Sequence, residues 1–173
     1  MNKYYTGIGS RQTPEDIQIL MTKIAKKLCS LGYVLRSGGA EGADVAFEKG
    51  AGSKKEIYLP WKNFNNNKST LYDVSEEIIK ESLEFHPTCS EYLSEAVKLI
   101  MGRNLQQVLG QDAKTPSSFV ICWTHFKLND VQLKHAGGTG QALRIASRYN
   151  IPIFNLNTDS TIKKLTDWLN EEI

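Results

Sequence analysis

The sequence predicts an α/β protein, a Rossmann-like three-layer sandwich with a mostly parallel central sheet. Short apolar runs alternate with longer segments of helical period, and the connections between them are short. Three glycine-rich turns stand between an apolar run and the helical segment that follows it. With 173 residues, 40% of them hydrophobic and 23% charged, the chain suits one globular domain, which we place at residues 1–173.

The predicted strands and helices follow one another in a regular order. The first helix has a clear start, because Thr13, Pro14 and Glu15 supply a polar cap, an early proline and an early acid, and Gly32 ends it. Strands are expected at residues 4–8, 33–36, 56–59, 118–123 and 151–156. Helices are expected at about residues 14–31, 71–83, 90–109 and 160–172. Two more are expected to run from the second glycine-rich turn to about residue 49 and from the third to about residue 149.

Charge and hydropathy limit where the chain acts. The formal net charge of +2 gives no reason to expect strong non-specific binding to nucleic acid, although a local basic site stays open. The N-terminal residues contain no apolar run long enough for a signal peptide, and no apolar stretch of about 20 residues could cross a membrane. We therefore expect no membrane association and a location in the cytoplasm.

Cysteine and histidine content argues against a metal site. The three cysteines are too few and too far apart for a disulfide framework or a cysteine-rich zinc site, and we expect them to be small buried hydrophobes: Cys29, Cys89 and Cys122. The three histidines have no metal-like spacing and are expected to be surface or core residues: His86, His125 and His135. We expect no metal and no resident cofactor.

The three glycine-rich turns carry the functional argument. In a parallel sheet, ligands lie beyond the carboxyl ends of the strands, and all three turns are expected at that edge. A helix N-terminus offers unpaired backbone N–H groups and a partial positive charge, which suit a phosphate. Glycine lets the backbone approach such an anion closely.

The first turn contains Gly9, Ser10 and Arg11, which add a hydroxyl donor and a guanidinium that can grip a phosphate. It lacks the third glycine of the dinucleotide fingerprint, so no NAD site is expected, and a purely structural turn is the alternative. The second turn, residues 37–39, precedes Asp44. That acid either favours the helix dipole or accepts from a ribose hydroxyl and orients Arg11.

The third turn places three glycines within four residues before a helix. Glycine loses the most backbone entropy on folding, so such a run is costly for a mere connection, and phosphate binding is the favoured interpretation. The preceding stretch, 124–135, either closes over the pocket or simply varies. Arg103 and Asn104 lie inside a helical segment, where a solvated charge on an amphipathic helix is the simpler interpretation.

Taken together, these motifs resemble those of the superfamily that joins the DNA-processing protein Smf/DprA to the "lonely guy" phosphoribohydrolases (SLOG), and most of all small DprA-like proteins of bacteriophage genomes. The resemblance runs from about residue 6 to 154. It comprises the glycine-serine-arginine motif at 9–11, the serine-glycine turn and aspartate at 37–44, the pair at 103–104 and the small-residue turn at 137–142.

The resemblance implies a nucleotide-phosphate pocket and leaves turnover open. In the phosphoribohydrolases an arginine and a glutamate flank the scissile N-glycosidic bond. Arg103 could stand for the arginine, but the position of the glutamate falls near Arg144, and a cation cannot serve as the general acid or base. Asp44 could replace the glutamate only if the fold brings it close.

Three functions are therefore weighed. The leading hypothesis is binding, without turnover, of a phosphate-bearing nucleotide or nucleotide-derived signal, for example by a phage protein that sequesters a host immune signal. The alternatives are a nucleoside-monophosphate N-glycosidase with Asp44 and Arg103 as weak catalytic candidates, and DprA-like binding of single-stranded DNA. The family also implies a possible homodimer. The expected ligand-binding residues are Gly9, Ser10, Arg11, Ser37, Gly38, Gly39, Asp44, Arg103, Asn104, Gly137, Gly138, Thr139 and Gly140.

Overall fold

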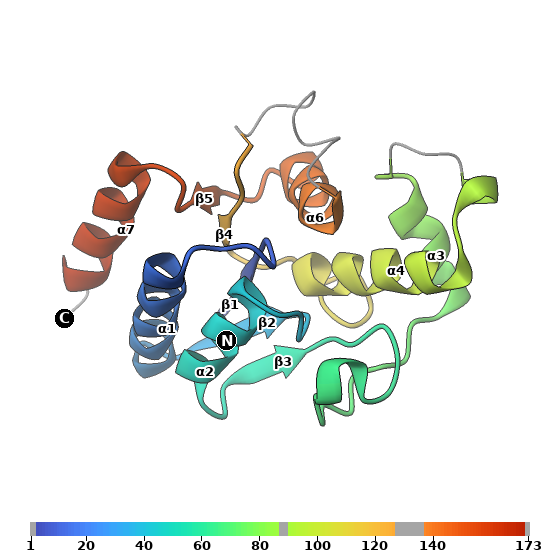
Figure 1. Ribbon diagram of the computed structural model, residues 1–173, viewed down its shortest axis with the longest axis horizontal. Helices are drawn as coiled ribbons and strands as arrows, with labels where there is room; N and C mark the ends of the chain where they lie inside the picture. The colour runs from blue at the N-terminus through green and yellow to red at the C-terminus, as the bar shows by residue number, and fades with distance from the viewer. Residues whose placement is uncertain (1–2, 87–89, 127–136, 172–173) are drawn as a thin grey trace.

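Five strands form one parallel sheet in the order β3-β2-β1-β4-β5 (Figure 1). The structure is a computed structural model that describes residues 3–86, 90–126 and 137–171. The strands are β1 (Lys3–Gly9), β2 (Tyr33–Ser37), β3 (Lys55–Ile57), β4 (Val120–Trp123) and β5 (Ile153–Asn155). The predicted α/β class and parallel sheet are confirmed, and the central position of β1 puts the reversal of strand order beside it.

Helices cover both faces of this sheet, which completes the three layers. The α-helices are α1 (Glu15–Ser30), α2 (Ala43–Ala51), α3 (Glu76–Leu83), α4 (Glu95–Leu109), α6 (Gly137–Arg148) and α7 (Asp159–Glu171). Two short 3-10 turns are η1 (Phe64–Asn66) and η2 (Ser90–Tyr92). Helices α1, α2 and α7 lie on one face, and α4 and α6, with α3 beyond α4, lie on the other (Figure 1). Within the described residues, no helix is both long and apolar enough to span a bilayer.

Two helices begin later than the hydrophobic pattern predicts. Ser75 Oγ accepts from Ile78 N at 3.3 Å, so α3 starts at Glu76 and not at residue 71. Ser94 Oγ accepts from Val97 N at 3.3 Å, so α4 starts at Glu95 and not at residue 90. In both cases the serine satisfies an otherwise unpaired N–H of the first helical turn, and this fixes the boundary.

The sheet separates two apolar cores, because successive side chains of a strand point to opposite faces. Leu35 and Ile121 belong to the core under α1, α2 and α7. Val120 and Cys122 belong to the core under α4 and α6. Cys122 is a free thiol whose pKa is raised by burial to about 12, as suits a small hydrophobe, whereas Cys29 is only half-buried. Cys89 lies outside the described residues.

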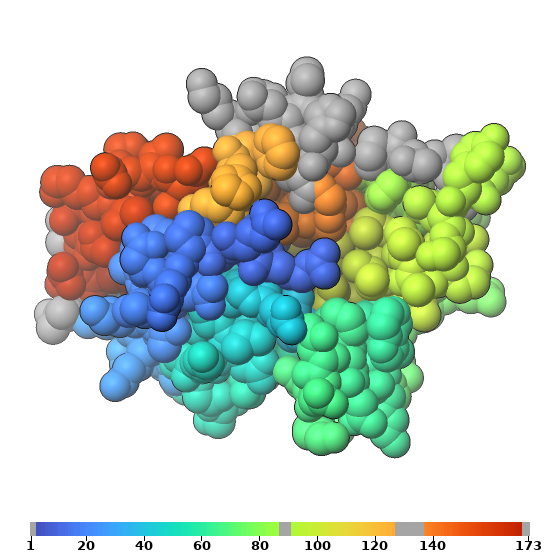
Figure 2. Space-filling view, in the orientation of Figure 1, coloured from blue at the N-terminus to red at the C-terminus, as the bar shows by residue number. Residues whose placement is uncertain are grey.

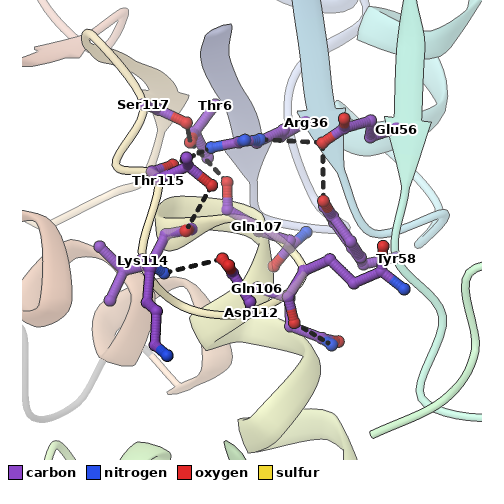
Figure 3. A network of polar contacts seen from close by, with 12 residues as sticks. Thr6, Arg36, Glu56, Tyr58, Gln106, Gln107, Asp112, Lys114, Thr115 and Ser117 are labelled. Carbon is purple, nitrogen blue, oxygen red and sulfur yellow. Dashed lines mark hydrogen bonds and ion pairs between the residues drawn. The ribbon is translucent and has the colours of Figure 1, made fainter.

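A polar network crosses the sheet beneath the end of α4 (Figure 3). Thr6, Arg36 and Glu56 are aligned on β1, β2 and β3, and the side chain of Arg36 is only 2% exposed. Arg36 Nε donates to Glu56 Oε2 at 3.0 Å, and Tyr58 OH donates to the same oxygen at 2.6 Å. The guanidinium also lies 3.8 Å from the ring centroid of Tyr4. Glu56 is therefore the common acceptor of a buried cation and a buried phenol.

The same network ties the connection after α4 to the sheet. Arg36 Nη1 donates to the carbonyl oxygen of Thr115. Thr6 Oγ1 donates to Gln107 O at 2.7 Å and lies 2.9 Å from Ser117 Oγ. These contacts place the carboxyl end of α4 under β1 and so help to set the height of the helix relative to the sheet edge where the candidate site lies.

Candidate functional site

A cavity of about 580 Å³ opens at the carboxyl edge of the sheet, where the strand order reverses between β1 and β4. Six segments line it. On the face shown in Figure 2, the dark-blue turn after β1 adjoins orange α6 and yellow-green α4. The lining residues are Ile8, Gly9, Ser10, Arg11, Gln12, Ala40, Asp44, Phe64, Ile100, Arg103, Asn104, Gln107, Thr124, His125, Phe126, Gly137, Gly138, Thr139 and Ala142.

The first turn is held rigidly while its arginine stays available. Ser10 N donates to Trp123 O at 3.1 Å, and Ser10 Oγ accepts from Gln12 N at 3.0 Å. These bonds anchor the turn to the end of β4. Arg11 is exposed, and it forms no ion pair with any carboxylate in the described part of the chain. The turn therefore presents an un-neutralised guanidinium at the cavity wall.

Glycines at the first two turns permit a close approach of two backbones. Gly42 precedes α2 with φ +79°, and a Cβ there would lie 2.7 Å from Ser10 O and 2.8 Å from Arg11 O. A Cβ at Gly9 would lie 2.8 Å from both Ala43 Cβ and Trp123 O. The first turn thus rests directly on the start of α2, with no space for a side chain between them.

The second turn already holds an anion of the protein. Asp44 Oδ2 accepts from Gly38 N at 3.2 Å and from Ala40 N at 3.3 Å, and Ser37 Oγ donates to Gly7 O at 2.6 Å. The hydroxyl of Ser37 and the N–H groups of Gly38 and Ala40 are therefore engaged within the protein. Ser37, Gly38 and Gly39 are not among the residues that line the cavity, whereas Asp44 is.

Arg103 is buried, so its interpretation as a solvated helix charge is wrong. It is 5% exposed; Nη1 donates to Gly38 O, and Nε donates to Asn104 Oδ1 at 3.1 Å. Asn104 Nδ2 in turn donates to Gln141 Oε1 at 2.9 Å and to Gly138 O at 3.3 Å. The pair on α4 thus connects the second turn with the third.

Asp44 is the unusual acid of the cavity. Its burial raises the pKa to about 6, against the opposing effects of the Arg103 guanidinium and of the N–H groups of Ala40 and Gly38. Burial also lowers the pKa of Arg103, and the negative charge of Asp44 opposes that shift. The carboxyl group is therefore poised to change its charge near neutral pH.

Replacing Asp44 by asparagine should change how stability depends on pH. The folded-state pKa of about 6 exceeds the ordinary value of 3.8, so the stability that this proton contributes is complete below pH 3.8 and is lost as the pH rises through about 6. As the pH rises across this window, the unfolding free energy of wild type should therefore fall by about 3 kcal/mol relative to that of Asp44→Asn, at roughly 1.4 kcal/mol per pKa unit. Urea titrations between pH 4 and 7.5 measure it; a difference that stays constant contradicts the assignment.

The third turn forms the start of α6. Gly137, Gly138 and Thr139 line the cavity, whereas Gly140 is buried within the helix and does not. Arg144, where the sequence resemblance predicts a glutamate, donates from Nε to Phe85 O at 2.7 Å and does not line the cavity. Of the predicted loop at 124–135, only residues up to 126 are described; His135 lies outside the described residues.

Sequence reasoning missed several of the residues that line the cavity, and His125 and Phe64 are two of them. His125, predicted as an ordinary surface or core histidine, lines the cavity with its ring centroid 4.4 Å from that of Trp123. Phe64 lines it from η1, inside a run that looked like a plain polar loop. The available signal was the asparagine-rich run at 63–67, because asparagine tolerates the left-handed conformation that builds tight turns.

No protein-family model and no curated protein matches the chain. Among solved structures, it is similar to DNA processing protein A from Helicobacter pylori, a structure described for its single-stranded DNA binding mode. The TM-score is 0.54 at 16% sequence identity, and the match covers 98% of this chain and 79% of that one. This likeness supports a DprA-like fold.

Proposed function

We propose that the cavity binds single-stranded DNA and lodges one nucleotide of the strand at a time. The observation that carries the proposal is the position of Arg11, an exposed and un-neutralised guanidinium, at the carboxyl edge of a parallel sheet. That edge is where α/β folds of this type take phosphate-bearing ligands. The fold likeness to a protein described for its single-stranded DNA binding mode supports a DNA strand as the ligand.

The charges around the cavity indicate where the phosphate would lie. The carboxylate of Asp44 already accepts from the N–H groups of Gly38 and Ala40, and its negative charge repels a further anion there. On the other side, the first turn of α6 offers the backbone N–H groups of Gly138 and Thr139. A phosphate held between Arg11 and the start of α6 avoids the carboxylate and uses both positive groups.

A free nucleotide or nucleotide-derived signal is the second candidate, and the size of the cavity favours it. About 580 Å³ falls within the range of small-molecule sites, roughly 300–1,000 Å³, and the net charge of +2 is modest for a DNA-binding protein. Sequestration of a signal by a phage-encoded protein would be one use of this mode.

N-glycoside hydrolysis ranks third: Asp44 lines the cavity with a suitable pKa, but the polar groups of Asp44 and Arg103 are engaged with the protein.

Fluorescence anisotropy with a labelled thymidine oligonucleotide tests the proposal. Arg11→Ala should weaken binding about tenfold and reduce the dependence of log K on log salt by about one unit, because one phosphate contact is lost. Arg148→Ala removes the same charge from an exposed position at the far end of α6 and should leave binding unchanged. Equal losses in both variants would indicate general electrostatics instead of a site.

The same protein distinguishes the alternatives. Binding of a labelled mononucleotide, together with no binding of the oligonucleotide, would favour the second candidate. Chromatography of the incubated nucleotide reports released base, which would favour the hydrolase and should disappear in Asp44→Asn. Binding of the oligonucleotide without release of base is the expected result.

A further inference from the structure

An aromatic pair, Trp61 and Phe64, stands at the rim of the cavity between β3 and α3. Phe64 lines the cavity and is half-buried, whereas Trp61 is 39% exposed. The two rings meet edge to face, with centroids 5.3 Å apart and an interplanar angle of 86°. An exposed tryptophan beside a cavity-facing phenylalanine leaves aromatic surface uncovered at the mouth of the cavity.

The backbone that carries the aromatic pair is unusual. Asn63, Asn65 and Asn66 have φ values of 62°, 49° and 58°, in the left-handed region that non-glycine residues seldom adopt. Asn65 Nδ2 donates to Gly39 O at 3.2 Å. Asn67 Nδ2 donates to Glu48 Oε2 at 3.0 Å. The loop is therefore built on a left-handed conformation that asparagine tolerates, and it is fastened to the second turn and to α2.

One cation contacts the aromatic pair, and two lysines are its neighbours in sequence. The Arg103 guanidinium lies 5.4 Å from the ring centroid of Phe64, at cation–π distance. Lys62 is exposed between the two aromatic residues in sequence, and Lys68 Nζ donates to Asn63 Oδ1 at 3.4 Å. Aromatic rings interleaved with cations are the combination that holds unpaired bases while tracking their phosphates.

We propose that Phe64 and Trp61 form the stacking site for the base whose phosphate is held at Arg11. This inference rests on the proposed function, because it supplies the base-binding half of the same cavity. The occupant is one unpaired nucleobase of the DNA strand, stacked on the aromatic surface at the cavity mouth. Base stacking is tolerant of sequence, so the site accepts a strand without reading it.

The test compares two probes of equal length: a thymidine oligonucleotide and an abasic strand with the same phosphates. Wild type should bind the thymidine strand more tightly. Phe64→Leu, which keeps an apolar side chain in the loop, should weaken binding of the thymidine strand about 10- to 100-fold and leave the abasic strand unchanged. Tyr149→Ala, which removes an exposed aromatic just after the end of α6, should change neither.

Tryptophan fluorescence supplies a second measurement. Stacking on Trp61 should quench its emission when the thymidine strand binds, and Trp61→Phe should abolish that quenching while keeping most of the affinity. Thermal melting confirms that each variant folds. The stacking site is overturned, with phosphate binding left intact, if wild type binds both strands with equal affinity. The same holds if Phe64→Leu weakens binding of the thymidine strand and of the abasic strand equally. Failure of wild type to bind either strand would overturn the proposed function and the stacking site with it.

Discussion

Glu56→Ala is expected to lower the free energy of unfolding by about 3 kcal/mol, the lower end of the range for breaking a buried ion pair. The variant leaves Arg36, whose side chain is 2% exposed, without its carboxylate, and removes the acceptor of the buried Tyr58 hydroxyl. The lower end applies because the side chain of Glu56 itself is 28% exposed and partly solvated. Urea denaturation measures the loss.

A double replacement separates the loss of a charge partner from the loss of the network as a whole. Arg36→Met combined with Glu56→Leu removes both charges, so the penalty of a lone buried guanidinium disappears and the double variant should be more stable than Glu56→Ala. Lys163→Ala breaks the exposed pair with Asp167 and should cost less than about 1 kcal/mol. A double variant less stable than Glu56→Ala would show that Arg36 does not need its partner.

Gly42→Ala should impair both stability and ligand binding. A side chain at φ +79° is strained, and its Cβ would meet the carbonyl oxygens of Ser10 and Arg11 at 2.7 and 2.8 Å. We expect a loss of about 2–4 kcal/mol in unfolding free energy from strain and overpacking together. Since the turn that carries Arg11 must move to relieve the contact, binding of the thymidine oligonucleotide should fall at least as far as in Arg11→Ala.

Gly32→Ala is the matched control for this substitution. Gly32 also has a positive φ, +88°, but a Cβ there meets nothing within 4 Å, and the residue lies in the turn between α1 and β2 at the other edge of the sheet. It should lose roughly 1–2 kcal/mol from backbone strain and bind the oligonucleotide as wild type does. If both glycine variants weaken binding equally, general destabilisation and not displacement of the first turn is the cause.

The fold could be predicted because it depends on patterns that are local in the sequence. Apolar runs of strand length, helical periods and the early acids of α1 suffice to place the elements in order, and their alternation implies the parallel sheet. The predicted polar cap of α1 does not form, because Pro14 occupies the N-cap position without a side-chain hydrogen bond. The starts of α3 and α4 could not be predicted from hydrophobic period. Ser75 and Ser94 set them through single cap hydrogen bonds, which the period does not register.

The candidate site depends on contacts between distant segments, and here sequence reasoning was less successful. A glycine-rich turn before a helix has the same local pattern whether it holds a ligand or a side chain of its own protein. At the second turn the anion is Asp44, six residues from Gly38. Likewise, the burial of Arg103 follows from the packing of α4 against Gly38, a partner 65 residues away.

The central position of β1 has a consequence for how the protein is made. This first strand hydrogen-bonds to β2 on one side and to β4 on the other, and β4 begins only at Val120. During synthesis, β1 can pair with β2 long before β4 emerges, so one of its edges waits unpaired and open to mispairing. Pairings so distant along the chain slow folding. The cavity, built from turns on both halves, is therefore completed only when the second half of the sheet docks.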